Sequence, residues 1–328
     1  MYTDEDLNTA IEKGIFTKSS VVEFRRLIAG LNGSPSVDEE NFKLVGGFND
    51  IFVVIACGLL LVSAFWVFQA VYDSLGLAVF AMLSWVLAEF FVRKRKMALP
   101  AIALLLAFVG SVFLVVISLS PNPDDVVFTF ATAVSTLAAI LHWRRFRVPI
   151  TVAVGTAAAL GLAVTVITNA FPESKNILLL LAFLGGIVAF TFAMYWDSSD
   201  TKRTSYKSDV AFWLHLLSAP LIIHPVFSSL GVLEGNESLG NMLAIVALYV
   251  LMTGVSIAID RRVFMVSSLV YVVYALSSLI ENYGGVGYSF AATGVVVGGA
   301  LLLLSAYWHR VRALILTRLP DLIQQKIP

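Results

Sequence analysis

Long apolar runs alternate with short polar segments along most of this chain. Between residues 51 and 308 there are ten such runs of roughly 17–22 residues, the length that a helix needs to cross the ~30 Å apolar core of a bilayer. Backbone groups cannot stay unpaired in hydrocarbon, and the runs are too long and uniform for barrel strands. The predicted spans are residues 51–71, 75–92, 99–119, 126–142, 149–170, 177–196, 210–229, 241–259, 263–281 and 289–308. The pattern therefore predicts an all-α fold, a polytopic membrane helical bundle with ten transmembrane helices.

Basic residues divide the segments between the spans into two alternating sets. One set, which includes both ends of the chain, carries 21 of the 22 Lys and Arg residues, and Lys175 alone belongs to the other set. The basic clusters occur at residues 1–49, 93–96, 144–147, 202–207, 261–262 and 310–326. By the positive-inside rule both termini are cytoplasmic. The zero formal net charge averages a basic face with an acidic face, so nucleic acid is not an expected partner.

Residues 1–49 precede the first span and predict a short cytoplasmic helical hairpin with a linker. Thr3 before three acids predicts a capped helix that ends at Gly14, and Thr17 predicts the cap of a second helix. Acids outnumber the five basic residues in this segment, which argues against a DNA-reading helix pair. We expect the apolar faces of the two helices to pack on each other, on the bundle or on a neighbouring copy.

The first third of the chain resembles a family of bacterial membrane proteins. The residues that carry the likeness are the pattern Leu7…Glu12-Lys13-Gly14-Ile15…Phe24…Leu27, the Gly-rich approach Gly46-Gly47-Phe48-Asn49-Asp50, the first-span stretch Ala56-Cys57-Gly58-Leu59-Leu60-Leu61, and Glu89 with Arg93-Lys94-Arg95-Lys96. Over roughly residues 1–110 they look like the polytopic proteins grouped under domain of unknown function 2157. That family is itself uncharacterised. The resemblance implies a location in the cell inner (plasma) membrane of a bacterium and implies no catalytic residue.

The span predicted at residues 210–229 contains the most unusual set of polar and proline residues. The candidate residues of an intramembrane polar path in this span are Trp213, His215, Ser218, Pro220, His224 and Pro225. On a regular helix His215 and His224 fall on opposite faces, so they share a site only if the prolines interrupt the helix. One interpretation is a discontinuous helix that lines a path for a solute or for protons. The other is that both histidines bond to neighbouring helices while the prolines shape the packing.

Glu89 is the one acid placed well inside a predicted span, and it completes the candidate polar path. Pairing with Arg93 one turn later is the ordinary explanation, whereas access to water would make Glu89 a site for a cation or a proton. Asp197, Asp200 and Asp209 bracket a longer segment between spans. We expect this segment to be a solvated loop of mixed charge, because its acids lack the spacing of a carboxylate metal motif.

The last predicted span contains a GxxxG motif formed by Gly294 and Gly298. This motif predicts close helix packing, either within the bundle or between two copies. Beyond residue 308, a short basic helix is expected to lie on the membrane surface as far as Pro320. The predicted organisation is a cytoplasmic hairpin and linker at 1–49, a ten-span bundle at 50–309 and a basic juxtamembrane tail at 310–328.

The sequence favours a transporter over an enzyme. HExxH, P-loop, GxSxG and CxxCH motifs are absent, and Cys57 is the only cysteine, so we expect no catalytic residue, no metal and no other cofactor. Ten spans with a doubly proline-containing helix favour transport of an unidentified small solute through a path lined by residues 210–229. The alternative is a non-transporting scaffold or regulatory subunit with the hairpin as docking site. The expected partners are the lipid bilayer and either a second copy or another membrane-complex subunit.

Overall fold

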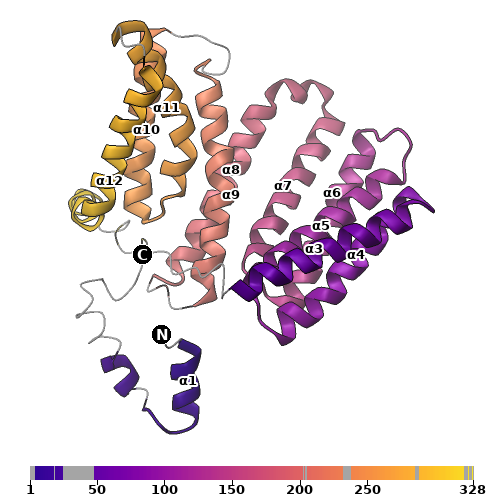
Figure 1. Cartoon of the computed structure of the whole chain (residues 1–328). Helices are drawn as coiled ribbons and strands as arrows, with labels where there is room; N and C mark the ends of the chain where they lie inside the picture. Colours follow the sequence, from indigo (N-terminus) through magenta and orange to yellow (C-terminus); the bar gives the residue numbers. More distant parts are fainter. Residues whose placement is uncertain are drawn as a thin grey trace. The chain divides into compact units, whose positions relative to one another are not determined.

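The computed structural model of the chain describes residues 4–17, 19–24, 48–201, 203, 205–231, 238–284, 288–320, 324 and 327. Its long helices are α3 (Phe48–Gln69), α4 (Asp73–Ala88), α5 (Ala98–Ser118), α6 (Asp125–Phe146), α7 (Ile150–Ala170), α8 (Leu178–Ser198), α9 (Tyr206–Ser228), α10 (Leu239–Ile259), α11 (Val263–Gly284) and α12 (Ser289–Leu316) (Figure 1). Within the described residues ten helices are long and apolar enough to cross a membrane, and no strand occurs. The protein is a polytopic membrane helical bundle, as predicted.

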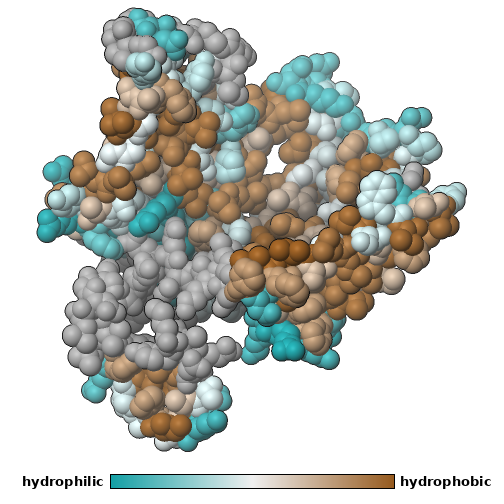
Figure 2. Space-filling view, viewed as in Figure 1, coloured by the Kyte–Doolittle hydropathy of each residue, from teal (hydrophilic) through white to brown (hydrophobic). Residues whose placement is uncertain are grey.

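The helices of the bundle expose a large apolar surface. Within the fold, the ten spanning segments bury between 11% and 56% of their residues. Leu59, Val295 and Leu302, for example, are 66%, 77% and 74% exposed. Figure 2 shows hydrophobic residues along the sides of the helices and hydrophilic residues mostly toward the helix ends. Exposing so much apolar surface to water would be unfavourable, whereas the hydrocarbon core of a bilayer can surround it.

Helix α9 is the most enclosed of the ten spans. Successive helices pack together from α3 through α7, α9 packs with α8, and α11 packs with both α10 and α12. Helix α9 contacts α7 and α11 in addition to α8. It buries 56% of its spanning segment, against 39% for α11, the next most buried. Polar side chains are therefore better shielded from lipid on α9 than elsewhere in the bundle.

Helix α9 is continuous although it contains Pro220 and Pro225. An interrupted helix was one of the two interpretations of the sequence here, and the structure shows an unbroken helix instead. A tight contact with α8 supports the proline-containing segment, because a Cβ added to Gly186 would lie 2.8 Å from Cγ1 of Ile222 and 2.9 Å from the carbonyl carbon of Leu221. Packing this close holds the backbone where prolines remove helical hydrogen bonds.

Helix α12 runs without a break to Leu316, past the predicted span end at residue 308. The separate surface helix expected after this point is instead the last part of α12. The chain has no helix breaker before Pro320, and Trp308 is only 2% exposed, so helix packing continues beyond the predicted boundary. Residues 321–323, 325–326 and 328 of the predicted basic tail lie outside the described part of the chain.

The chain divides into two compact units, residues 1–42 and residues 43–328. In the first unit α1 (Asp4–Glu12) is followed by a helical segment at residues 19–24. These two segments agree with the predicted helical hairpin. The predicted cap Thr3, the rest of the second helix and the linker, up to residue 47, lie outside the described residues.

Residues 13–17 make the turn of this hairpin, and their chemistry explains it. Gly14 has a φ of +69°, a left-handed conformation that glycine adopts without steric cost. Oγ1 of Thr17 accepts a hydrogen bond from the N–H of Ser20 at 3.1 Å, which is the predicted cap. Leu7 and Val21 are 8% and 4% exposed whereas Val22 is 52% exposed, so the apolar faces of this unit are covered only in part.

Candidate functional site

Asp197 and His215 meet between α8 and α9. Asp197 lies in the last turn of α8, and His215 lies on the following helix. Nε2 of His215 is 2.8 Å from Oδ2 of Asp197, and both side chains are fully buried. Because a carboxylate only accepts hydrogen bonds, Nε2 is the donor. Consecutive helices that pack together thus place an acid and an imidazole, 18 residues apart in the chain, at the same depth.

Arg261 completes this cluster from the turn between α10 and α11. Its Nη2 donates to Oδ1 of Asp197 at 2.7 Å, and its Nε lies 3.4 Å from Oδ2. Nη2 is also 3.1 Å from both the hydroxyl and the carbonyl oxygen of Ser208. The Arg261 side chain is 2% exposed. We call Asp197, His215 and Arg261 the polar centre.

Asp260 forms a second polar cluster, next to Arg261 in the chain. Nη1 of Arg203 donates to Oδ2 of Asp260 at 3.0 Å, and Nε1 of Trp308 donates to Oδ1 at 2.9 Å. Nε of Arg312 lies 3.6 Å from the same Oδ1. Burial, together with the positive charge of Arg261, lowers the pKa of the Arg203 guanidinium, which remains charged because arginine starts so far above neutrality. Through Arg203, Asp260 and Trp308, this cluster joins the connection between α8 and α9, and the turn between α10 and α11, to α12.

One ring nitrogen of His215 has no hydrogen-bond partner among the described residues. The ring centroids of Phe190 and Phe264 lie 5.5 Å and 6.2 Å from the imidazole centroid. Nδ1 is buried among such neighbours without a donor or acceptor. Leaving a buried polar atom unpaired costs roughly 1–3 kcal/mol, so an atom of this kind marks a position that water or a proton could use.

The other predicted path residues of α9 lie at different positions around the helix. Ser218 is fully buried, and its hydroxyl donates to the carbonyl oxygen of His215 at 3.1 Å. Trp213 is half-buried, Pro220 is exposed and Pro225 is buried. Ser218 thus bonds to the backbone and not to the imidazole of His215, and the structure does not gather the whole set on one face.

His224 does not share a site with His215. His224 is exposed, and its Nδ1 lies 2.7 Å from the hydroxyl oxygen of Tyr271 on α11. The predicted location of the two histidines on opposite faces of a regular helix is confirmed. Each histidine is bonded to a neighbouring helix, α8 for His215 and α11 for His224, as the packing interpretation expected.

Glu89 lies at the start of a π-helical turn, η1 (Glu89–Lys94), that continues α4. Nε and Nη2 of Arg145, at the end of α6, donate to its two carboxylate oxygens at 2.6 Å and 3.0 Å. The predicted contact with Arg93 is present and longer, at 3.4 Å. Within the described part of the chain, the partners of Glu89 are these two arginines and not residues of α9.

Gly294 and Gly298 lie on a face of α12 that no other described helix covers. A Cβ added at either glycine would meet no neighbouring atom within 4 Å. The close packing within one chain that the GxxxG motif predicted is therefore not found among the described residues. Packing between two copies stays a prediction.

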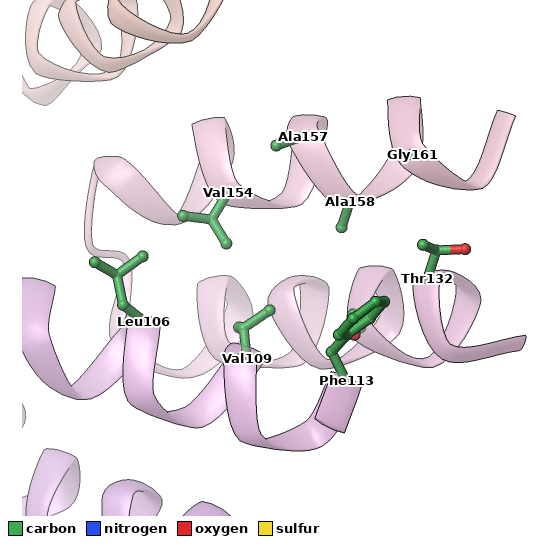
Figure 3. Close-up of a pocket in the computed structure, with 10 residues that line it drawn as sticks. Leu106, Val109, Phe113, Thr132, Val154, Ala157, Ala158 and Gly161 are labelled. Carbon is green, nitrogen blue, oxygen red and sulfur yellow. The ribbon is translucent and has the colours of Figure 1, made fainter. Parts of the chain in front are cut away.

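A separate cavity of about 300 Å³ lies between α5, α6 and α7 (Figure 3). Its lining is mainly apolar, and Val109 and Phe113 on α5 lie opposite Val154 and Ala158 on α7. Ser135 contributes a buried hydroxyl without a partner in the described part of the chain. None of the predicted path residues lines this cavity. Its chemistry suits an apolar guest better than a polar solute.

Asp197 and Arg261 are the functional candidates that sequence reasoning missed. The prediction that Asp197 belongs to a solvated loop is wrong, since its side chain has no exposed surface. A signal was present, because Asp197 directly follows a long apolar run and lies at the depth of His215 in the next span. Asp200, by contrast, lies in the connecting segment, where it accepts hydrogen bonds from the backbone and hydroxyl of Ser205.

The polar centre has to be interpreted from its own chemistry. Among the described residues, no three His, Cys, Asp or Glu side chains are grouped so that they could hold a metal ion. No protein-family model, curated protein or solved structure matches this chain. The resemblance of the first 110 residues to the domain of unknown function 2157 proteins stays a prediction.

Proposed function

We propose that the protein transports an unidentified small solute, and that the polar centre exchanges a proton during transport. Ten membrane-spanning helices supply the scaffold for such a role. The alternation of basic residues supports cytoplasmic termini. The resemblance in the first third of the chain supports a bacterial inner membrane. The HExxH, P-loop, GxSxG and CxxCH motifs, which would support a catalysed reaction instead, do not occur in the sequence.

The fully buried contact between His215 and Asp197 is the observation that carries this proposal. Ionisable side chains within membrane-spanning helices are costly, and they commonly serve ion or proton pathways. His215 keeps Nδ1 available, and it lies on the most enclosed helix. A proton on Nδ1 would place a second positive charge beside Asp197, where Arg261 already provides one.

The connections of Arg261 give this protonation a mechanical consequence. Arg261 joins the α10–α11 turn to Asp197 of α8 and to Ser208 of α9. A protonated His215 would attract Asp197, 2.8 Å away, and repel Arg261, so it would compete with Arg261 for this carboxylate, whereas loss of the proton would leave Asp197 to Arg261. Under this proposal the junction would have two arrangements, one for each protonation state of His215, of the kind that alternating access requires.

Cysteine accessibility tests whether water reaches the polar centre. Cys57 is replaced by Ala, and single cysteines are placed at Ser218 and, as a matched control, at Gly298 on the uncovered face of α12. We expect a membrane-impermeant thiol reagent to label the cysteine at position 218 and to spare the one in lipid, because thiols react as thiolates in water. If neither cysteine is labelled, the result would contradict a water-filled path.

A scaffold or regulatory subunit is the second candidate, and the Asp260 cluster favours it. Both carboxylate oxygens of Asp260 accept hydrogen bonds, from Arg203 and Trp308, as expected of a dry bundle whose polar groups pair internally. Under this alternative, residues 1–49 would dock a partner protein. An unlabelled cysteine at position 218, with normal yield and folding, would make the scaffold role the better explanation.

A further inference from the structure

A strongly basic patch lies where η1 and α6 end. Four consecutive basic residues, Arg93 to Lys96, follow α4, and three more occur at Arg144, Arg145 and Arg147. All seven side chains are exposed. Glu89 is the only acid in the sequence between Asp73 and Asp124, and none occurs between Asp125 and Glu173. The contact between Arg145 and Glu89 brings the two basic segments together.

A surface groove of about 400 Å³ opens beside this patch. It is lined by Val86, Glu89, Phe90, Arg93 and Lys94. Val86 and Phe90 are 56% and 43% exposed and lie within the span predicted at residues 75–92, whereas Arg93 and Lys94 follow it. The groove therefore has an apolar wall toward the hydrocarbon and a basic wall toward the helix end.

The π-helical turn shapes the basic wall of the groove. The N–H of Arg95 bonds to the carbonyl of Phe90 at 3.0 Å, five residues back, so this turn holds one residue more than an α-helical turn. Lys94 and Arg95 lie 5.9 Å and 5.6 Å from the Phe90 ring centroid. Turns of this kind are frequent at functional sites, where they place side chains that a regular helix would turn away.

Glu89 leaves much of this positive charge uncompensated. Its two oxygens receive the close bonds of Arg145, while Arg93 lies 3.4 Å away with a side chain that is 55% exposed. One carboxylate thus stands among seven cations. An anion with an apolar tail would match both walls of the groove.

We propose that this groove binds an anionic phospholipid of the surrounding bilayer. The phosphate lies on Arg93 and Lys94, and an acyl chain lies along Val86 and Phe90. Juxtamembrane basic clusters attract anionic headgroups, and guanidinium groups suit phosphate oxygens. This site is independent of the proposed transport function, because it shares no residue with the polar centre.

Lipid binding can be measured on the purified full-length protein in nonionic detergent by native mass spectrometry. We expect the wild type to bind phosphatidylglycerol about tenfold more tightly than phosphatidylcholine of the same acyl chains. The variant Arg93→Gln/Lys94→Gln should lose most of this preference. The matched control Arg310→Gln/Arg318→Gln removes two exposed charges at the end of α12 and should keep it.

A substitution in the apolar wall of the groove distinguishes a lipid site from a site that binds phosphate alone. Phe90→Ser should weaken phosphatidylglycerol binding, and soluble glycerol 3-phosphate should not compete with the lipid. Equal affinity of the wild type for both lipids, an unchanged preference in Arg93→Gln/Lys94→Gln, or efficient competition by glycerol 3-phosphate would each overturn the proposal. If the double variant does not fold, the lipid preference of the wild type is measured at 500 mM NaCl instead. Salt screens contacts between exposed charges, so a preference for phosphatidylglycerol that survives this salt concentration would also overturn the proposal.

Discussion

Asp197 and Arg261 are separated by 64 residues in the chain and form a two-point ion pair with almost no exposed surface. The distances are 2.7 Å from Nη2 to Oδ1 and 3.4 Å from Nε to Oδ2. Removing both charges from water is expensive, and the pair is tolerated because His215 and Ser208 satisfy further hydrogen bonds. The pair therefore fixes how α8, α9 and the α10–α11 turn fit together.

Arg261→Gln should destabilise the protein strongly. The change leaves Asp197 as a buried carboxylate with only His215 beside it, and breaking a buried pair in this way costs roughly 3–5 kcal/mol. Asp197→Asn/Arg261→Gln should recover part of that loss, because it removes the uncompensated charge as well. The thermal unfolding midpoint of the purified protein in detergent measures both effects.

The exposed pair of Asp125 and Lys175 supplies the control for this prediction. These side chains are 51% and 50% exposed, so Asp125→Asn should cost less than about 1 kcal/mol. A loss as small for Arg261→Gln as for Asp125→Asn would show that the buried pair does not hold the helices together.

The sequence predicted the ten spans because their signal is local. Each span is a run of apolar residues long enough to cross the bilayer, and no knowledge of its neighbours is needed. Helical periodicity likewise placed His215 and His224 on opposite faces, and the structure confirms this with one buried and one exposed ring. The late end of α12 was missed because the burial of Trp308 depends on Asp260, which lies 48 residues earlier.

The polar centre was not predictable for the same physical reason. Periodicity tells which face of a helix a residue occupies, but not which helix covers that face. Glu89 shows this clearly, because Arg93 was visible one turn away while its closer partner Arg145 is 56 residues distant. Asp197 was taken for a loop residue because the guanidinium that makes its burial tolerable comes from another turn of the chain.

His215→Gln should abolish proton movement while leaving the protein folded. The glutamine amide can still donate a hydrogen bond to Asp197, but it cannot accept and release a proton as the imidazole does. His224→Gln is the matched control, since His224 is exposed and bonded only to Tyr271 among its described neighbours. The measurement is proton uptake into proteoliposomes with an internal pH-sensitive dye. Equal rates for His215→Gln and the wild type would remove His215 from the transport mechanism.

Trp308→Phe should loosen the end of α12. The substitution keeps an aromatic ring in the buried site but removes the hydrogen bond from Nε1 to the Asp260 carboxylate, which is worth roughly 1.5–3 kcal/mol. Trp66 is 67% exposed, so Trp66→Phe should change stability by less than about 0.5 kcal/mol. Unfolding midpoints compare the two variants, and similar values would mean that Trp308 is not anchored by Asp260.

Gly186→Ala should destabilise the α8–α9 pair, because the new methyl group would lie 2.8 Å from Cγ1 of Ile222 and 2.9 Å from the Leu221 carbonyl carbon. Overpacking of this kind costs roughly 1–3 kcal/mol. It should also move Asp197 relative to His215, so proton uptake should fall together with the unfolding midpoint. A variant with normal stability and normal uptake would show that α8 can shift without affecting the polar centre.

Gly294→Ala is the matched substitution on α12, where no described atom lies within 4 Å of the added methyl group. In a monomer it should be neutral or stabilising by up to about 1 kcal/mol, because alanine favours the helix more than glycine does. A loss of stability as large as that of Gly186→Ala would instead mean that a second copy packs on this face. Chemical cross-linking of cysteines placed at Val295 would then distinguish the two cases, since only a dimer brings two copies of this 77% exposed position together.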